Sequence, residues 1–416
     1  PEKLDNLFPD IATNHLPAVA GIFFILGLLS KENTITFLAI IPFALWLFRR
    51  RKIKPILTVS GILFLTTIFY LFVRFQIFGF VLNADPSTDI MNNPFYGTTG
   101  GERLATVMYT SMLYLKLCIF PHPLTHDYYP YHIPIMNFSD WQVILSLIIY
   151  AAIIFSIFYF WKKNKIISFA FGFFLASLSI VSNMFVNVGT FMNERFVFIA
   201  SLGICILLVY LFKIFSSIVK EKSNMMYLGL AGIFALGDSM KTFERVPAWE
   251  SELALNSEAI KVSTNSARAN SFMATALFNE FKVTTDRDER YRLLLEAEPY
   301  MRKAVKMYPN YKNGNLMRSG IAAEMYKFDN DLPKLLNEFR EIAYIRPDIE
   351  YITEYMKYMN KRGDVAQLTS FYTDVATELL RRNINNTWAV HYLLLGYEIN
   401  PSNPNINKLL IKNYNK

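Results

Sequence analysis

Seven apolar runs, all within the first 240 residues, restrict this chain to folds that a lipid bilayer can hold. Crossing the hydrocarbon takes about 20 helical residues, and backbone groups in lipid must pair within their own segment. The first two runs and the last are short for this, so we expect neighbouring helices to support them. The runs lie at about 17–30, 33–48, 55–80, 141–161, 166–187, 195–213 and 225–240. The sequence therefore predicts an all-α fold with a polytopic helical membrane domain.

The apolar surplus ends near residue 240, which predicts two domains of different solvent preference. The 416 residues are 53% hydrophobic and 18% charged, but the C-terminal part is rich in Lys, Glu, Asn and Tyr and has no long apolar run. We expect a polar cytoplasmic segment at 1–16, a membrane domain at 17–245 with an outer loop at 81–140, and a helical domain at 246–416. The chain begins at Pro1, and we expect further residues upstream.

Basic clusters follow the second, fourth and sixth runs and set the orientation. They lie at 49–54, 162–165 and 213–222. Because Lys and Arg are enriched in cytoplasmic flanks, we expect all three clusters inside the cell. Alternation then places four segments outside the membrane: 30–33, 81–140, 188–194 and everything after about 241. The composition is typical of bacteria, so the sequence predicts an inner-membrane protein whose C-terminal domain lies in the periplasm.

One further apolar segment, 104–120, has two interpretations. Its composition is compatible with a crossing, but both of its flanks must be outside if the basic clusters are inside. We favour a re-entrant or interfacial helix over a true span.

Five charged residues are predicted to meet at the outer membrane face: Lys31, Glu32, Arg74, Glu194 and Arg195. A charge at the centre of a bilayer helix costs about 2.5–3.5 kcal/mol on insertion scales, so these side chains should lie at an interface or face a protein-lined cavity. Each also has a structural interpretation. Lys31 and Glu32 can close a helical hairpin as an ion pair, Arg74 can extend to the interface, and Glu194 can end a helix beside a surface arginine. Their convergence on one face favours a binding site.

The outer loop combines a stiff backbone with polar side chains. Four prolines between 121 and 134 restrict the chain around His122, His126, Asp127 and His132. Such a pre-set loop suits a binding site. These four side chains lack a recognised ligand spacing, so we predict no metal. The chain also lacks a phosphate-cradling glycine loop, a Rossmann fingerprint and a serine-nucleophile elbow, and no cofactor is predicted.

The C-terminal part shows degenerate repeat spacing. Ala297, Ala304 and Pro309 stand at the offsets that small residues and the closing proline have in the second helix of a tetratricopeptide repeat, and similar ends recur at Pro347 and Pro401. The steps of 38 and 54 residues between these prolines depart from the ideal 34. Stacked helix pairs form a surface for peptides or partner proteins. We expect a docking module, with a soluble cap without ligand as the alternative.

Several stretches together carry a family resemblance. They are "LGLLSKENTITF", "NNPF" followed by "RLATVMYTSMLYLKLCIFPHPLTHDYYPYHIP", "LSIVSNMFVNVGTFMNERFVFIASLGICILL" and "FERVPAWESELALNSEAIKVSTNSARANSFMATAL". The chain resembles the membrane O-mannosyltransferases with C-terminal tetratricopeptide repeats, a family of the GT-C glycosyltransferase class. The resemblance covers most of residues 17–310.

This resemblance implies an enzyme that moves a sugar, expected to be mannose, from a polyprenyl-phosphate donor to Ser or Thr hydroxyls of acceptor proteins on the extracytoplasmic side. The family's first outer loop normally supplies an acidic catalytic residue, and that part is absent here. We therefore expect the chain to be a fragment. The alternative is that another carboxylate of this chain acts as the base.

Site roles follow from the resemblance and from the clustering of charge. A lysine in the Ser-Lys-Glu turn is expected to face the lipid phosphate, and arginines suit bidentate phosphate contact. The predicted lipid-phosphate ligands are Lys31, Arg74, Arg195 and His126. The predicted catalytic carboxylates are Asp127, Glu194 and Glu32. Glu32 is expected to orient Lys31, and Asp127 is expected to bind sugar hydroxyls or assist the base.

Two rival functions remain open. A noncatalytic membrane scaffold would present the repeat domain to partners, and it would not need its charges to converge. A GT-C enzyme of cell-envelope glycan assembly would use another lipid or a polymer as its acceptor. A transporter is disfavoured because no matched pair of broken helices is found near the midplane. The net charge of +8 lies mostly beside apolar segments, so nucleic acid is not predicted as a partner.

Overall fold

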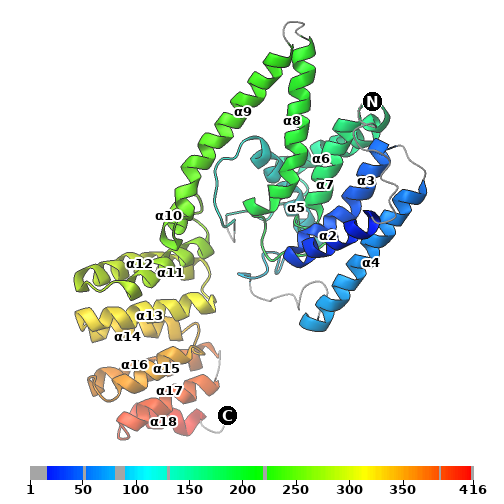
Figure 1. Ribbon diagram of the computed structural model, residues 1–416. Coiled ribbons are helices and arrows are strands. Elements are labelled where there is room, and N and C mark those ends of the chain that lie inside the picture. Colours follow the sequence, from blue (N-terminus) through cyan, green and yellow to red (C-terminus); the bar gives the residue numbers. More distant parts are fainter. Residues whose placement is uncertain are drawn as a thin grey trace. The chain divides into compact units, whose positions relative to one another are not determined.

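The computed structural model describes residues 16–49, 53–79, 90–128, 132–218, 223–383 and 386–413 (Figure 1). The predicted all-α fold is confirmed, since no strand occurs in these ranges. Most of the expected polar segment 1–16, part of the outer loop and parts of two basic clusters lie outside the described residues. The chain divides into two compact units, Pro1–Pro247 and Ala248–Lys416, called here the first and the second unit.

The first unit contains the apolar helices. They are α2 (Leu16–Ser30), η1 (Glu32–Thr36), α3 (Phe37–Arg49), α4 (Ile53–Phe78), α6 (Trp141–Lys163), α7 (Lys165–Ser179), η2 (Glu194–Val197), α8 (Phe198–Ile218) and α9 (Ser223–Arg245). Among the described residues, three segments are long and apolar enough to cross a membrane: Ile53–Phe78, Trp141–Lys163 and Glu194–Ser217. Three more apolar helices are shorter, and α9 belongs to neither group. A membrane location follows, while the seven expected crossings stay a prediction.

The fifth expected run, 166–187, is wrong at its outer end. Helix α7 stops at Ser179, and residues 180–193 form turns and bends. Asn183 adopts a left-handed conformation with φ of 62°. Its side-chain amide donates to the carbonyl oxygens of Thr190 (2.7 Å) and Phe191 (3.0 Å). The Asn183 amide thus pairs backbone carbonyl groups of this apolar segment. Without such a partner, these buried groups would have to be paired within a helix.

Helix α5 (Gly100–Ile119) lies in the protein core of the first unit. A capping box of Thr99 and Glu102 fixes its start. Tyr114 is fully buried, and the hydroxyl of Tyr150 on α6 donates to the Ser111 carbonyl oxygen at 2.8 Å. Helix α5 is not among the candidate spans of the described chain. Whether it enters the membrane from the outer side stays a prediction.

Helices α7 and α8 approach closely at Gly203. A Cβ atom at this position would lie 2.5 Å from the Ala170 carbonyl oxygen, so no larger residue fits without a shift. Small residues at such crossings allow helix backbones to pack tightly in membranes. This contact holds α7 and α8 together, and these two helices flank residues 180–193 and η2.

The second unit is a stack of helical layers in Figure 1. Its helices are α10 (Glu252–Val262), α11 (Ala267–Val283), α12 (Arg287–Met307), α13 (Lys312–Asp329), α14 (Leu332–Ala343), α15 (Glu350–Met359), α16 (Val365–Arg382), α17 (Asn386–Ile399) and α18 (Pro404–Asn413), preceded by η3 (Val246–Trp249). Two apolar clusters fill it, one over α11–α13 and the other over α13–α18.

Two helices of this unit begin with the same pair of hydrogen bonds from an asparagine side chain to the preceding turn, called here the asparagine bracket. The Asn270 side chain donates to the carbonyl oxygens of Thr264 (3.0 Å) and Ser266 (2.7 Å). Asn315 repeats this with Pro309 (2.7 Å) and Tyr311 (2.9 Å). In each case the acceptors lie six and four residues earlier. The bracket holds the turn that precedes α11 and α13 in the same conformation.

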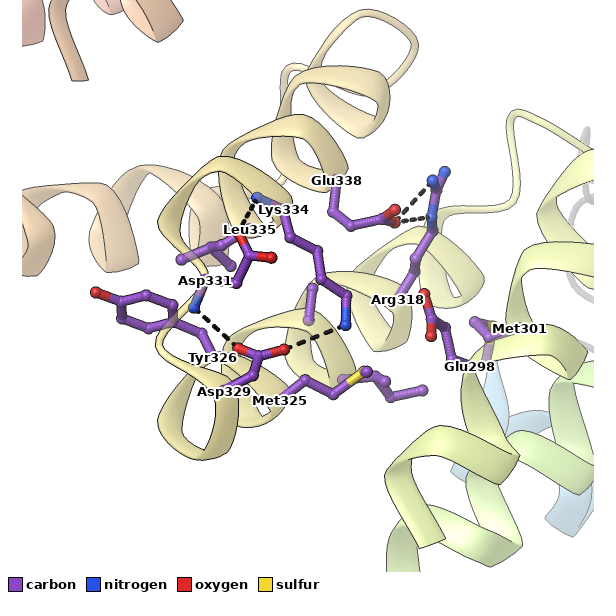
Figure 2. Close-up of a pocket in the computed structure, with 12 residues that line it drawn as sticks. Glu298, Met301, Arg318, Met325, Tyr326, Asp329, Asp331, Lys334, Leu335 and Glu338 are labelled. Carbon is purple, nitrogen blue, oxygen red and sulfur yellow. Dashed lines mark hydrogen bonds and ion pairs between the residues drawn. The ribbon is translucent and has the colours of Figure 1, made fainter. Parts of the chain in front are cut away.

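An ion network joins α12, α13 and α14. The Glu338 side chain, only 5% exposed, pairs with Arg302 and with Arg318, the latter at 2.8 Å. Arg302 also pairs with Glu298 at 2.9 Å, and Arg318 with Glu341. Figure 2 shows Glu338 and Arg318 meeting beside Glu298. A buried carboxylate between two guanidinium groups keeps its charge compensated.

Candidate functional site

A cavity of about 250 Å³ opens in the first unit between η1, α4 and the segment 180–196. Its polar lining side chains include Lys31, Glu32, Arg74 and Asn187, and Phe196 closes one side. The cavity therefore combines cationic, anionic and apolar groups in a space large enough for a small polar headgroup.

The position of Lys31 depends on a tight turn. Lys31 is extended between α2 and η1, and its N–H donates to the Gly27 carbonyl oxygen at 2.8 Å. The Thr34 hydroxyl donates to the same oxygen at 2.9 Å, and a Cβ at Gly27 would lie 2.8 Å from the Thr34 methyl. The Lys31 side chain is exposed and has no ion-pair or hydrogen-bond partner in the described part of the chain. Its ammonium group is thus available to an anion.

Arg74 is held by three neighbours. Its Nη1 donates to Glu32 Oε2 at 2.7 Å and to the Tyr70 hydroxyl at 3.3 Å, and its guanidinium lies 5.7 Å from the Phe78 ring centroid. The expectation that Glu32 orients Lys31 differs from this arrangement, because the carboxylate pairs with Arg74 on α4 instead.

A second polar group forms where the outer loop meets η2. Glu194 accepts hydrogen bonds from the Thr125 N–H and from the Tyr128 hydroxyl, the latter at 2.9 Å. The Asn193 side chain donates to the His126 carbonyl oxygen at 2.8 Å. The loop at 125–128 is thereby fastened to the start of η2.

The groups in this loop are largely buried. Asp127 is 5% exposed, and the Thr125 hydroxyl lies 3.5 Å from both the N–H and the carbonyl oxygen of Asp127. Burial, followed by the charge of Glu194, raises the pKa of the Tyr128 phenol. Tyr128 is therefore a stable hydrogen-bond donor to Glu194 at neutral pH.

The guanidinium of Arg195 forms no ion pair with Glu32 or Glu194 in the described part of the chain. Arg195 is exposed, and its guanidinium lies 5.6 Å from the ring centroid of Phe196, the residue that lines the cavity. Its N–H donates to the Asn193 side chain at 3.2 Å. The suggested pairing of Glu194 with Arg195 is thus replaced by the contacts of Glu194 with the outer loop.

The structure sorts the predicted residues into two sets. Lys31, Glu32 and Arg74 line the cavity, whereas His126, Asp127 and Glu194 meet at the loop contact. No group of three possible metal ligands is found among the described His, Cys, Asp and Glu residues.

The sequence reasoning did not single out two residues of this region. Asn187 lines the cavity, and its amide donates to the Asn93 side chain at 3.2 Å. Asn193 joins η2 to the outer loop. The sequence signal that could have identified such a residue is an asparagine in an apolar run, because a buried amide needs a specific hydrogen-bond partner.

Comparison with known proteins gives a consistent family signal. The chain is 29% identical over 201 residues to the human protein O-mannosyl-transferase TMTC3, covering 47% of this chain and 21% of that protein. The chain is a distant homologue of protein O-mannosyl-transferases. The mouse TMTC3 protein O-mannosyl-transferase is 25% identical over 297 residues, covering 69% of this chain and 31% of that protein.

A third relative is the protein O-mannosyl-transferase F38B6.6 of Caenorhabditis elegans, 26% identical over 248 residues, or 58% of this chain and 32% of that protein. This homology confirms the resemblance to membrane O-mannosyltransferases. The matches span between 21% and 32% of the length of these three relatives. No protein-family model and no solved structure matches the chain.

Proposed function

We propose that this chain is part of a membrane glycosyltransferase that moves a sugar, mannose by analogy with its relatives, from a polyprenyl-phosphate donor to Ser or Thr hydroxyls of proteins. The observation that carries the proposal is the cavity of the first unit, which is lined by the Arg74–Glu32 ion pair and by Lys31, a lysine with no ion-pair partner among the described residues. Distant homology to protein O-mannosyl-transferases supports the reaction class.

Lys31 and Arg74 are the proposed ligands of the lipid phosphate. During transfer, the acceptor oxygen bonds to the anomeric carbon, the bond from that carbon to the phosphate oxygen breaks, and the phosphate leaves with added negative charge. Cations fixed near that oxygen stabilise the charge in a site with little water. Arg74 is already ordered by Glu32, so little side-chain entropy remains to be lost when a phosphate binds. Arg195 and His126 stay secondary candidates for the same role.

Glu194 is the proposed carboxylate of the acceptor side. The attacking hydroxyl must give up its proton, and a carboxylate within hydrogen-bond reach can accept it. Glu194 is held by Thr125 and Tyr128 but is not fully buried. Asp127 is buried in the same loop and is proposed to shape it or to contact sugar hydroxyls. An acidic residue upstream of the chain, as the family resemblance implies, is the alternative base.

The second unit is proposed as a tetratricopeptide-type domain on the extracytoplasmic side that docks the acceptor. The repeated bracket of Asn270 and Asn315 supports a repeat origin, because equivalent turns begin successive helices. We further propose the bacterial inner membrane as the location. The basic clusters and composition support this orientation and location.

Binding of the donor tests the phosphate site without requiring turnover. The chain in lipid nanodiscs is titrated with a fluorescent polyprenyl-phosphate mannose. Losing a charge-assisted hydrogen bond costs about 1.5–3 kcal/mol, so Lys31→Ala is expected to weaken binding about 10- to 100-fold. The matched control is Lys54→Ala. Lys54 is an exposed lysine at the start of α4, whereas the cavity residue Arg74 lies near the end of that helix, so this variant should bind like wild type. Equal affinity of Lys31→Ala and wild type would refute the phosphate site.

Transfer assays then separate the roles within the full-length protein. Glu194→Gln should abolish transfer while keeping donor affinity, because only the proton acceptor is lost. Removal of residues 250–416 should reduce transfer to folded protein acceptors far more than transfer to short peptides. If Glu194→Gln retains wild-type turnover, the base lies elsewhere. Transfer to a glycan but not to protein hydroxyls would favour the cell-envelope alternative.

A further inference from the structure

The outward side of helix α6 combines aromatic rings with two lysines at one end. The side that packs on the protein is defined by buried residues spaced three and four apart, which are Val143, Ser146, Tyr150 and Ile153. On the opposite side, Phe155, Phe158 and Tyr159 are 66%, 71% and 46% exposed. Lys162 and Lys163 follow on the same side in the last turn, and both are exposed. We call these last five residues the α6 strip.

The surroundings of the α6 strip follow from the length of its helix. Helix α6 is one of the three described segments that are long and apolar enough to cross a membrane. When α6 spans a bilayer, the rings of the strip face lipid chains, because this side points away from the protein. The lysines in the last turn then stand where the hydrocarbon meets the headgroups.

The two lysines are ordered by aromatic rings and not by carboxylates. The Nζ atom of Lys162 lies 4.8 Å from the Trp161 ring centroid, and that of Lys163 lies 3.7 Å from the Tyr159 centroid. Neither lysine forms an ion pair within the described ranges. Helix α6 contains no Asp or Glu, and its N-cap Asp140 lies at the opposite end, about 33 Å away at about 1.5 Å per residue. Two exposed positive charges therefore lack a carboxylate partner in the described structure.

A stack of aromatic rings stands beside these ammonium groups. Trp46 in the last turn of α3 stacks on Trp161, with 4.8 Å between centroids and an interplanar angle of 24°. Phe43 continues the stack at 6.2 Å from Trp46. Gly172 on α7 makes room for Phe43, because a Cβ atom there would collide with the ring. Residues of three helices thus fix the ring over which Lys162 lies.

This arrangement matches an amphiphile with a negative headgroup. The cations stand at the end of an apolar side, so a ligand that fills both parts has an anionic group joined to hydrocarbon chains. A zwitterionic headgroup would bring its own cation next to two lysines that have no described carboxylate. Charge complementarity therefore favours a lipid with a net negative headgroup.

We propose that the α6 strip and the stacked Trp46 and Trp161 bind an anionic phospholipid. Its phosphate oxygens accept hydrogen bonds from the ammonium groups of Lys162 and Lys163, and its acyl chains pack along the rings of the strip. This site is separate from the cavity proposed for the donor. Ile35 lines that cavity before α3 begins, whereas Trp46 lies at the far end of α3.

Quenching of tryptophan fluorescence by brominated lipids measures binding at this site. Three of the five tryptophans are removed by Trp141→Phe, Trp249→Phe and Trp388→Phe, so that Trp46 and Trp161 remain as reporters. The whole chain is reconstituted in phosphatidylcholine bilayers. The probes are phosphatidylglycerol and phosphatidylcholine with brominated acyl chains, and the ratio of their quenching is compared within each variant.

The expected preference follows from the two lysines. A lysine near an anionic lipid surface contributes about fivefold, so the chain should bind phosphatidylglycerol about 25-fold more tightly than phosphatidylcholine. Lys162→Gln and Lys163→Gln should each lower this preference about fivefold, whereas Lys163→Arg should keep it. The matched control is Lys213→Gln, which removes an exposed lysine of α8 and should leave the preference unchanged.

Three results would overturn the proposal. The first is equal quenching by both lipids in the chain with unaltered lysines. The second is a loss in Lys213→Gln as large as in Lys163→Gln, which would assign the preference to general surface charge. The third is displacement of the lipid by soluble glycerol phosphate, which would identify a site for free phosphate. Donor binding at Lys31 is measured separately, so a failure there would leave a lipid preference that depends on Lys163 intact.

Discussion

The ion network of the second unit permits a quantitative test of its packing. Glu338 lies between Arg302 and Arg318, with 5% of its side chain exposed, and it is the only network carboxylate that contacts both arginines in the described structure. Replacing Glu338 by Gln keeps the shape of the side chain and removes its charge. Two guanidinium groups then face each other near a neutral amide.

The expected cost follows from what each arginine retains. Removing one partner of a buried ion pair costs about 3–5 kcal/mol. Here Arg302 is 42% exposed and keeps Glu298, and Arg318 keeps Glu341, which is 49% exposed. These remaining pairs place the expected loss at the lower end, about 3 kcal/mol. For a domain of 150–250 residues, 1 kcal/mol corresponds to about 2–4 °C, so the melting temperature of the second unit should fall by about 6–12 °C.

Thermal unfolding of the whole chain in detergent, followed by hydrogen exchange of α14 amides, measures this loss. Glu289→Gln is the control, because Glu289 forms an exposed pair with Arg292 on α12. Exposed pairs contribute little to stability, so the control should melt like wild type. A Glu338→Gln protein that melts with the control, with unchanged exchange in α14, would show that the network does not stabilise the second unit.

Two further predictions concern the first unit. Gly203→Ala should lower the thermal stability of the membrane helices in detergent, because its Cβ would meet the Ala170 carbonyl oxygen. Gly229→Ala is the control and should be neutral, because no atom lies within 4 Å of a Cβ at that position. Equal effects of the two substitutions would contradict the close α7–α8 approach. Burial lowers the pKa of His132 in the outer loop. The unfolded chain therefore binds more protons below about pH 6.5, so stability should fall as pH drops from 7.5 to 5.5. His132→Gln should reduce this dependence in pH-resolved unfolding without removing it, because burial also lowers the pKa of His391 in the second unit. A variant that keeps the full wild-type dependence would reject this assignment.

Much of the helical layout could be predicted from hydrophobic periodicity. Long apolar runs led directly to α4 and α6, since a buried or lipid-facing helix leaves a continuous signal in the sequence. The apolar run at 166–187 predicted a helix longer than α7, because hydropathy does not record side-chain hydrogen bonding. Asn183 pairs backbone groups that would otherwise need a helix, and its polar side chain is a single residue in an apolar window.

The candidate site was only partly accessible to sequence reasoning. Alternation of the helices indicated that Lys31 and Arg74 share one side of the membrane, and the structure places both at one cavity. The pairing of Glu32 with Arg74 joins residues 42 positions apart, so it depends on how α2 and α4 pack. Sequence neighbours suggested Lys31 as the partner of Glu32, but Lys31 is extended before η1 and Glu32 is the first residue of η1, and the Glu32 carboxylate reaches Arg74 on α4 instead. The chemical roles of these residues stay predictions.

The asparagine brackets of Asn270 and Asn315 have a consequence for how this protein changes over evolutionary time. Each bracket is built from seven consecutive residues, so the signal that starts a new helix travels with its own short piece of chain. Helices between two such signals can lengthen, shorten or be duplicated while the next start remains intact. The uneven steps between successive modules are therefore a tolerated outcome of their construction, and the number and length of the helices in the stack are free to vary.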